Sequence, residues 1–166
     1  MISRLKSSLQ NASNAYSIKR HYLTDISLPV TTINVAIQIG NNSNKLVVGL
    51  SQLTTAGSIT ISSATSVDLS ALNFLSGSLT LEDKLDNTMR NFTANNLSVV
   101  REDFVIVNNS LLTSVSLSGL LSAGTINIAE NPGLETMSFD ELSAVGSVNI
   151  SGNLKRYAAP VILKSA

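Results

Sequence analysis

Pairs of alternating apolar residues recur along most of this chain at a spacing close to 22 residues. Six such pairs stand at Ile37/Ile39, Ile59/Ile61, Leu79/Leu81, Phe104/Ile106, Ile126/Ile128 and Val148/Ile150. Their first members follow one another after 22, 20, 25, 22 and 22 residues. Apolar residues two positions apart indicate a strand with one buried face, and a repeat of this length is typical of a stacked solenoid.

Each repeat also carries a second, shorter apolar alternation. In the clearest unit, Ile126 to Gly146, this is Met137-Ser138-Phe139, and Asn131-Pro132-Gly133 marks the turn before it. Two strands per coil are implied. The expected fold is an all-β, right-handed parallel β-solenoid of about 22 residues per coil, similar to leucine-rich-repeat solenoids. A single coil cannot offset the backbone entropy lost on ordering, so neighbouring coils must stack.

The ends of the chain differ from the repeat. Residues 1–25 contain basic residues and serines but no acidic residue before Asp25, a pattern that resembles a mitochondrial transit peptide. A basic N-terminal cap is favoured, because the open end of a repeat stack needs covering. We therefore expect a cap or targeting-like segment at 1–25, the solenoid at 26–153, and a C-terminal cap or partial coil at 154–166.

Two residue types recur at fixed places in the coil. Four asparagines each lie three residues after the second member of an apolar pair: Asn42, Asn109, Asn131 and Asn153. Stacked at one corner, their amides would satisfy backbone groups of the turns, so a structural asparagine ladder is favoured over ligand contact. Glycines precede the following strand by two residues, and a backbone bend that a Cβ would obstruct explains them: Gly57, Gly77, Gly124 and Gly146.

The third coil is irregular and is where a functional site is most to be expected, between Glu82 and Arg101. Five residues, 85–89, are inserted before Phe92, and an acidic group formed by Glu82, Asp83 and Asp86 lies beside them. Carboxylates on a loop suit calcium, but a solvated turn is the favoured interpretation. The sequence predicts no catalytic residue, no cofactor and no metal site.

Composition narrows the class of partner. Eleven basic and eleven acidic residues cancel, and only 13% of residues are charged, which argues against a nucleic-acid partner. The chain has no cysteine and one histidine, and no apolar run reaches the roughly 18 residues of a transmembrane helix. Open strand edges at the two ends of a solenoid make end-to-end homo-oligomers possible.

The segment from Leu134 to Ile150, with its Met-Ser-Phe strand, Leu142, the Val145-Gly146 step and the next strand, resembles the receptor L-domain repeat. It is most similar to the version in the fungal GPI-anchored cell-wall organisation and sporulation proteins. Ile26-Ser27-Leu28-Pro29 looks like a half-repeat of the same kind. The resemblance implies a folding pattern and a location outside the cell, at its surface or in its wall.

N-glycosylation sequons begin at Asn11, Asn41, Asn91, Asn96, Asn108 and Asn149. With the Ser-, Thr- and Asn-rich composition, they favour a non-enzymatic cell-surface or cell-wall glycoprotein that binds a protein or glycan partner through a solenoid face. The absence of cysteine and of an apolar secretory core supports an alternative, a cytoplasmic structural or scaffold repeat protein. A polysaccharide-active β-helix enzyme is less favoured, because outward strand positions are small and polar, as at Thr60, Thr80 and Asn127.

Overall fold

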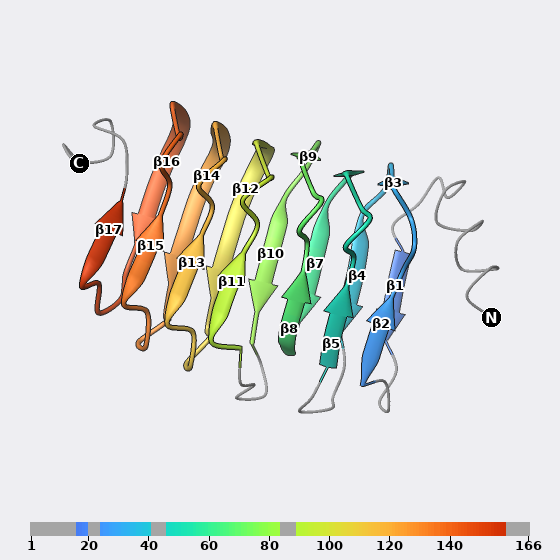
Figure 1. Ribbon diagram of the computed structural model, residues 1–166, viewed down its shortest axis with the longest axis horizontal. Helices are drawn as coiled ribbons and strands as arrows, with labels where there is room; N and C mark the ends of the chain where they lie inside the picture. The colour runs from blue at the N-terminus through green and yellow to red at the C-terminus, as the bar shows by residue number, and fades with distance from the viewer. Residues whose placement is uncertain (1–15, 20–23, 41–45, 84–88, 159–166) are drawn as a thin grey trace.

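The chain folds into parallel β-strands stacked as coils along one axis. The computed structural model describes residues 16–19, 24–40, 46–83 and 89–158, and every regular element in these ranges is a strand. All pairings between the described strands are parallel, and Figure 1 shows the coils side by side in two layers. The predicted all-β parallel solenoid is confirmed.

One layer is a large sheet of ten strands. Seven of its strands form the main ladder, and the six apolar pairs lie in the last six of them: β1 (Tyr16–Lys19), β4 (Ile37–Gly40), β7 (Ile59–Ser62), β10 (Leu79–Glu82), β12 (Val99–Val107), β14 (Ser122–Ala129) and β16 (Ala144–Ile150). Three short strands form a branch that joins the start of β12: β3 (Thr32–Ile33), β6 (Thr55–Ala56) and β9 (Phe74–Leu75).

The other layer consists of two separate side sheets. The N-terminal side sheet contains three strands: β2 (Asp25–Ser27), β5 (Leu46–Gly49) and β8 (Ala64–Asp68). The C-terminal side sheet contains four: β11 (Asn91–Thr93), β13 (Ser114–Ser116), β15 (Thr136–Ser138) and β17 (Arg156–Ala158). In Figure 1 these seven strands lie in front of the large sheet, with β8 and β11 as neighbours near the middle.

The apolar pairs stack directly on one another in the core. Ile59 is paired with both Ile37 and Leu79, and the same register continues through Phe104 and Ile126. Every member of the first five pairs is at most 1% exposed. The sixth pair, Val148/Ile150, is only partly buried. Identical positions in successive coils therefore cover each other, and this stacking buries the apolar surface that drives folding.

The structure departs from the predicted two strands per coil. The short strands β3, β6 and β9 add a third strand to the early coils. In later coils the equivalent residues begin the long strands β12, β14 and β16, and a bulge in β12 between Val100 and Asp103 takes up the extra residue. The short strands β3, β6 and β9 each have one inward residue, so the sequence shows no apolar alternation at their positions.

The parallel ladder also extends past the boundaries expected from sequence. Strand β1 lies before residue 26 and pairs with β4, with Tyr16 opposite Ile37 and Ile18 opposite Ile39. At the other end β17 lies beyond residue 153 and pairs with β15. Residues 16–19 and 156–158 are thus strands of the solenoid sheets.

The recurrent glycines lie where one coil touches the next. A Cβ on Gly124 would lie 2.7 Å from the carbonyl oxygen of Glu102, and one on Gly146 would lie 2.5 Å from that of Gly124. None of the described glycines has a positive φ. Close approach of the neighbouring backbone, rather than unusual dihedral angles, is therefore what requires glycine here.

Replacing one of these glycines tests the coil spacing. We expect Gly124→Ala to lower the free energy of unfolding by about 1–3 kcal/mol, because the methyl group would press on backbone that cannot move aside. Gly49→Ala is the control, since its Cβ would have no neighbour nearer than 3.8 Å, and its effect should stay within about 0.5 kcal/mol. Urea unfolding followed by circular dichroism measures both, and equal effects would contradict the explanation.

Candidate functional site

The side layer is interrupted between the second and third coils. Strand β8 pairs with β5, and β11 pairs with β13, but β8 and β11 belong to different sheets. The coil spacings of 20 and 25 residues on the two sides of Leu79 explain the break, because the chain reaches β8 and β11 by connections of different length. Ser63, at a φ of 61°, turns the chain directly from β7 into β8.

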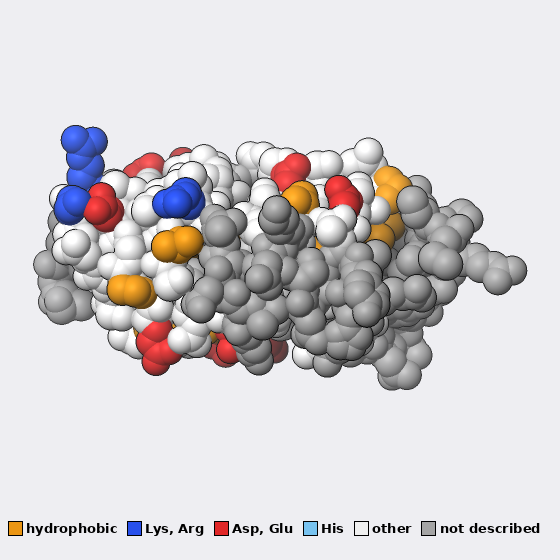
Figure 2. Space-filling view, turned by 90° about the horizontal axis from the view of Figure 1, so that it is seen from below, with side chains coloured by type: hydrophobic (Ala, Val, Ile, Leu, Met, Phe, Trp, Pro, Cys, Tyr) orange, Lys and Arg blue, Asp and Glu red, His pale blue; other side chains and the backbone are white. Residues whose placement is uncertain are grey.

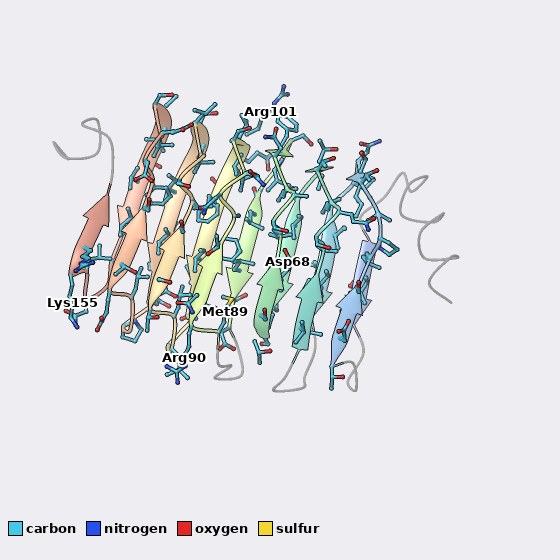
Figure 3. The ribbon with its side chains drawn as sticks, in the orientation of Figure 1. Asp68, Met89, Arg90, Arg101 and Lys155 are labelled. Atoms are coloured by element: carbon cyan, nitrogen blue, oxygen red, sulfur yellow. The ribbon has the colours of Figure 1, made fainter. Side chains whose placement is uncertain are left out.

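A groove of about 410 Å³ lies at this interruption. The described residues that line it come from both edges: Val67, Asp68, Ser70, Asn91, Thr93, Asn95 and Asn96. Four of the seven belong to the irregular third coil in which the sequence predicted a site. Figure 3 shows Asp68 at the end of β8, between Arg101 at the upper edge of the molecule and Arg90 at the lower edge.

The asparagines of the groove are each held at one end of the amide. Asn91 Oδ1 accepts a hydrogen bond of 2.7 Å from Ser114 Oγ. Asn95 Oδ1 accepts one of 2.7 Å from Ser116 Oγ and one of 3.2 Å from the Ser118 backbone N–H. Neither Nδ2 has a partner among the described residues. The two amides are therefore oriented by the C-terminal side sheet and keep free donors.

Asn96 is held by its Nδ2 rather than by its Oδ1, and it links the two edges of the groove. Its Nδ2 donates a hydrogen bond of 2.6 Å to the Ser70 carbonyl oxygen, and its own carbonyl accepts one of 3.0 Å from Asn73 Nδ2. Within the described part of the chain, Asn96 Oδ1 has no donor. Asp68 accepts a 3.0 Å bond from the Ser70 N–H through Oδ1 only. The groove thus offers free acceptors as well as free donors.

Among the described residues, the predicted asparagine ladder forms between Asn109 and Asn131. Asn109 and Asn131 are buried, and the Asn109 N–H donates to Asn131 Oδ1 at 2.9 Å. Asn131 Nδ2 donates in turn to the Ala129 and Ile106 carbonyls at 2.8 and 2.9 Å. These amides satisfy backbone groups that the corner buries. Asn42 lies outside the described residues.

Asn153 does not continue the ladder, which corrects the sequence-based expectation. Its side chain is exposed, and it forms no hydrogen bond with any other described residue. Asn108 and Glu130, which precede the buried asparagines, have positive φ values of 61° and 58°, whereas Gly152, which precedes Asn153, does not. Without that left-handed turn, the chain does not direct Asn153 into the corner.

The sequon asparagines are distributed over several surfaces. Asn91 and Asn96 line the groove, and Asn108 is exposed at the corner. Asn149 lies on the outer side of β16, where its Nδ2 donates to Asn127 Oδ1 at 2.9 Å. Asn11 and Asn41 fall outside the described residues.

The acidic group of the third coil is described only in part. Asp83 is 8% exposed, and Asp86 lies outside the described residues. Across the described ranges, no group of three or more His, Cys, Asp or Glu side chains is placed to hold a metal ion. No helix there is long and apolar enough to cross a membrane.

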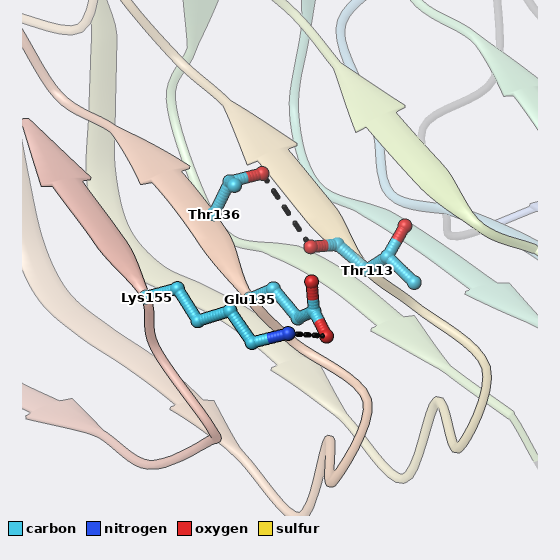
Figure 4. A network of polar contacts seen from close by, with 4 residues as sticks. All are labelled: Thr113, Glu135, Thr136 and Lys155. Atoms are coloured by element: carbon cyan, nitrogen blue, oxygen red, sulfur yellow. Dashed lines mark hydrogen bonds and ion pairs between the residues drawn. The ribbon is translucent and has the colours of Figure 1, made fainter.

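The last described coil carries the ion pair Lys155–Glu135, at 2.6 Å, beside the bond from Thr136 Oγ1 to the Thr113 carbonyl (Figure 4). The Lys155 and Glu135 side chains are 61% and 42% exposed, so the pair contributes little to stability.

The groove draws four of its described lining residues from the coil that the sequence singled out, but sequence reasoning did not name Asp68, Ser70 or Asn95. Asp68 and Ser70 belong to the preceding coil, and only the pairing of strands shows that they face the third. The detectable signal was the unequal spacing of the apolar pairs on either side of Leu79. Neither a protein-family model nor a solved structure matches this chain.

The ladder can be tested by removing its central amide. We expect Asn131→Ala to lower the free energy of unfolding by about 2–4 kcal/mol, because several buried backbone and amide groups lose their partners at about 1–3 kcal/mol each. Asn153→Ala, at the exposed equivalent position, should change it by less than about 0.5 kcal/mol. Urea denaturation compares the two, and a stable Asn131→Ala protein would rule out a structural role for the ladder.

Proposed function

We propose that the protein is a non-enzymatic cell-surface or cell-wall repeat protein that binds a protein or glycan partner through one face of the solenoid. The observation that carries the proposal is the groove between β8 and β11, where an otherwise regular stack presents oriented amides and hydroxyls. A binding site of this kind needs a rigid frame, and the fully buried apolar pairs on both sides of it provide one.

The character of the surface supports a binding role outside the cell. Figure 2 shows a face that is mostly white where it is described, the colour of the backbone and of side chains that are neither charged nor hydrophobic, with a few charged and hydrophobic side chains spread over it. Outward positions of the large sheet are mostly small and uncharged, as at Thr60, Thr80 and Asn127. The resemblance of residues 134–150 to the receptor L-domain repeat favours the same class.

The chemistry of the groove supports binding rather than hydrolysis. Asp68 is the one carboxylate among the described residues that line it. Most glycoside hydrolases use two carboxylates that flank the bond to be broken. The remaining lining side chains are amides, hydroxyls and a valine, which hold a ligand but do not move protons at neutral pH.

Binding to isolated yeast cell walls tests the proposal and its location on the molecule. The chain, purified from bacteria and so free of glycans, is mixed with washed walls, and the fraction that sediments is measured. We expect Thr93→Arg in the groove to reduce that fraction at least about threefold, because the added side chain fills the groove. Thr80→Arg places the same residue at an outward position of the large sheet and serves as the matched control.

Failure of the unaltered protein to sediment with walls would count against a wall partner. An equal loss in Thr93→Arg and Thr80→Arg would show that charge, not the groove, governs binding.

Secretion tests the compartment separately. Expressed in yeast behind a signal peptide, the chain is expected to acquire N-linked glycans, because exposed sequon residues such as Asn149 lie on open strand faces. Endoglycosidase treatment should then increase its mobility on a denaturing gel. A secreted chain whose mobility the enzyme leaves unchanged would favour the cytoplasmic scaffold instead.

A further inference from the structure

The described residues that line the groove between β8 and β11 are polar with one exception. Its described polar side chains are three amides, two hydroxyls and one carboxylate: Asn91, Asn95, Asn96, Ser70, Thr93 and Asp68. Val67, partly buried and packed against the core, is the single apolar member of this set. Such a lining suits a ligand that both donates and accepts hydrogen bonds and carries no charge.

Other ligand classes fit less well. An anion would meet the Asp68 carboxylate with no Lys, Arg or His among the described lining residues to balance it. A cation such as calcium takes six to eight oxygen ligands, typically with several carboxylates, and Asp68 stands alone. An apolar peptide or acyl chain would find only Val67 and would leave the amides without partners, which is unfavourable.

The free ends of the amides match a polyhydroxylated ligand. Asn91 Nδ2 and Asn95 Nδ2 are donors without partners in the described structure, while Asn96 Oδ1 and Asp68 Oδ2 are acceptors without donors. A sugar hydroxyl donates one hydrogen bond and accepts others, so it can bridge such groups. The held ends fix the amides in place, which limits the entropy lost on binding.

We propose that this groove binds a neutral oligosaccharide. The inference rests on the proposed function, in that it assigns a ligand class to the same face. A volume of about 410 Å³ lies within the range of small-molecule sites, so one or a few sugar units fill it. No aromatic ring is among the described lining residues, so stacking does not add to the affinity. We expect hydrogen bonds to give a Kd of about 1 mM or tighter.

The test uses three neutral hexasaccharides as probes: laminarihexaose, N-acetylchitohexaose and α-mannohexaose. A heparin hexasaccharide is the acidic comparison. Binding to the full chain purified from bacteria is measured by saturation-transfer NMR and titration. At least one neutral probe is expected to bind, and the acidic one is not.

Asn95→Asp is the decisive variant. It keeps the oxygen that accepts from Ser116 and Ser118, so the local fold is retained, but it replaces the free Nδ2 donor with an acceptor. We expect the affinity for the bound probe to fall at least about fivefold, as for a lost hydrogen bond with an unpaired group left behind. Asn127→Asp is the matched control, because Asn127 also accepts through Oδ1, from Asn149, on the large sheet.

A second pair of variants removes a hydroxyl without adding charge. Thr93→Val should weaken binding, whereas Thr60→Val, at an outward position of β7, should not.

Several results would overturn the proposal. They are no binding of any neutral probe, tighter binding of the acidic probe, or equal losses in a groove variant and its control. If walls bind in a Thr93-dependent way while no probe does, the partner is a protein and the proposed function stands without the saccharide. If a probe binds through the groove while walls do not, the saccharide site stands and the wall role fails.

Discussion

Every part of this molecule depends on the in-register stacking of apolar pairs between neighbouring parallel strands. Ile59 is covered by Ile37 on one side and Leu79 on the other, and all three are at most 1% exposed. A single coil cannot bury its inward side chains by itself, because the coils beside it cover their flanks along the axis. Stability therefore depends on contacts between neighbouring coils. The Val148/Ile150 pair, which a described coil covers on one side, is only partly buried.

The polar interior follows from the same stacking. Bending the chain inward at a corner buries backbone carbonyls, and the Asn109 and Asn131 amides satisfy them. At both of these positions the preceding residue, Asn108 or Glu130, adopts a left-handed conformation. Ser63 makes the same turn in the second coil but is followed by Ala64, so the turn and the ladder are separable features.

Much of the fold was accessible from the sequence because one strong periodicity determines it. The spacing of the apolar pairs predicted the parallel stack, its coil length and the irregular third coil. The short strands β3, β6 and β9 were missed, since two residues cannot show an alternation. The prediction that Asn153 joins the ladder was wrong, because residue spacing does not reveal the backbone conformation of Gly152. The sequence did not predict that Asp68 and Asn95 line one groove. Their proximity depends on the missing pairing between β8 and β11.

The break between β8 and β11 also has a mechanical consequence. Across it, the described backbone hydrogen bonds between the second and third coils lie in the large sheet and in the turns next to that sheet, and side-chain bonds such as those of Asn96 add to them. Among the described residues, the two side sheets thus lie next to each other without a backbone pairing between them. A ligand held between β8 and β11 would therefore bridge the two side sheets and add a link between coils in the layer where strand pairing is interrupted.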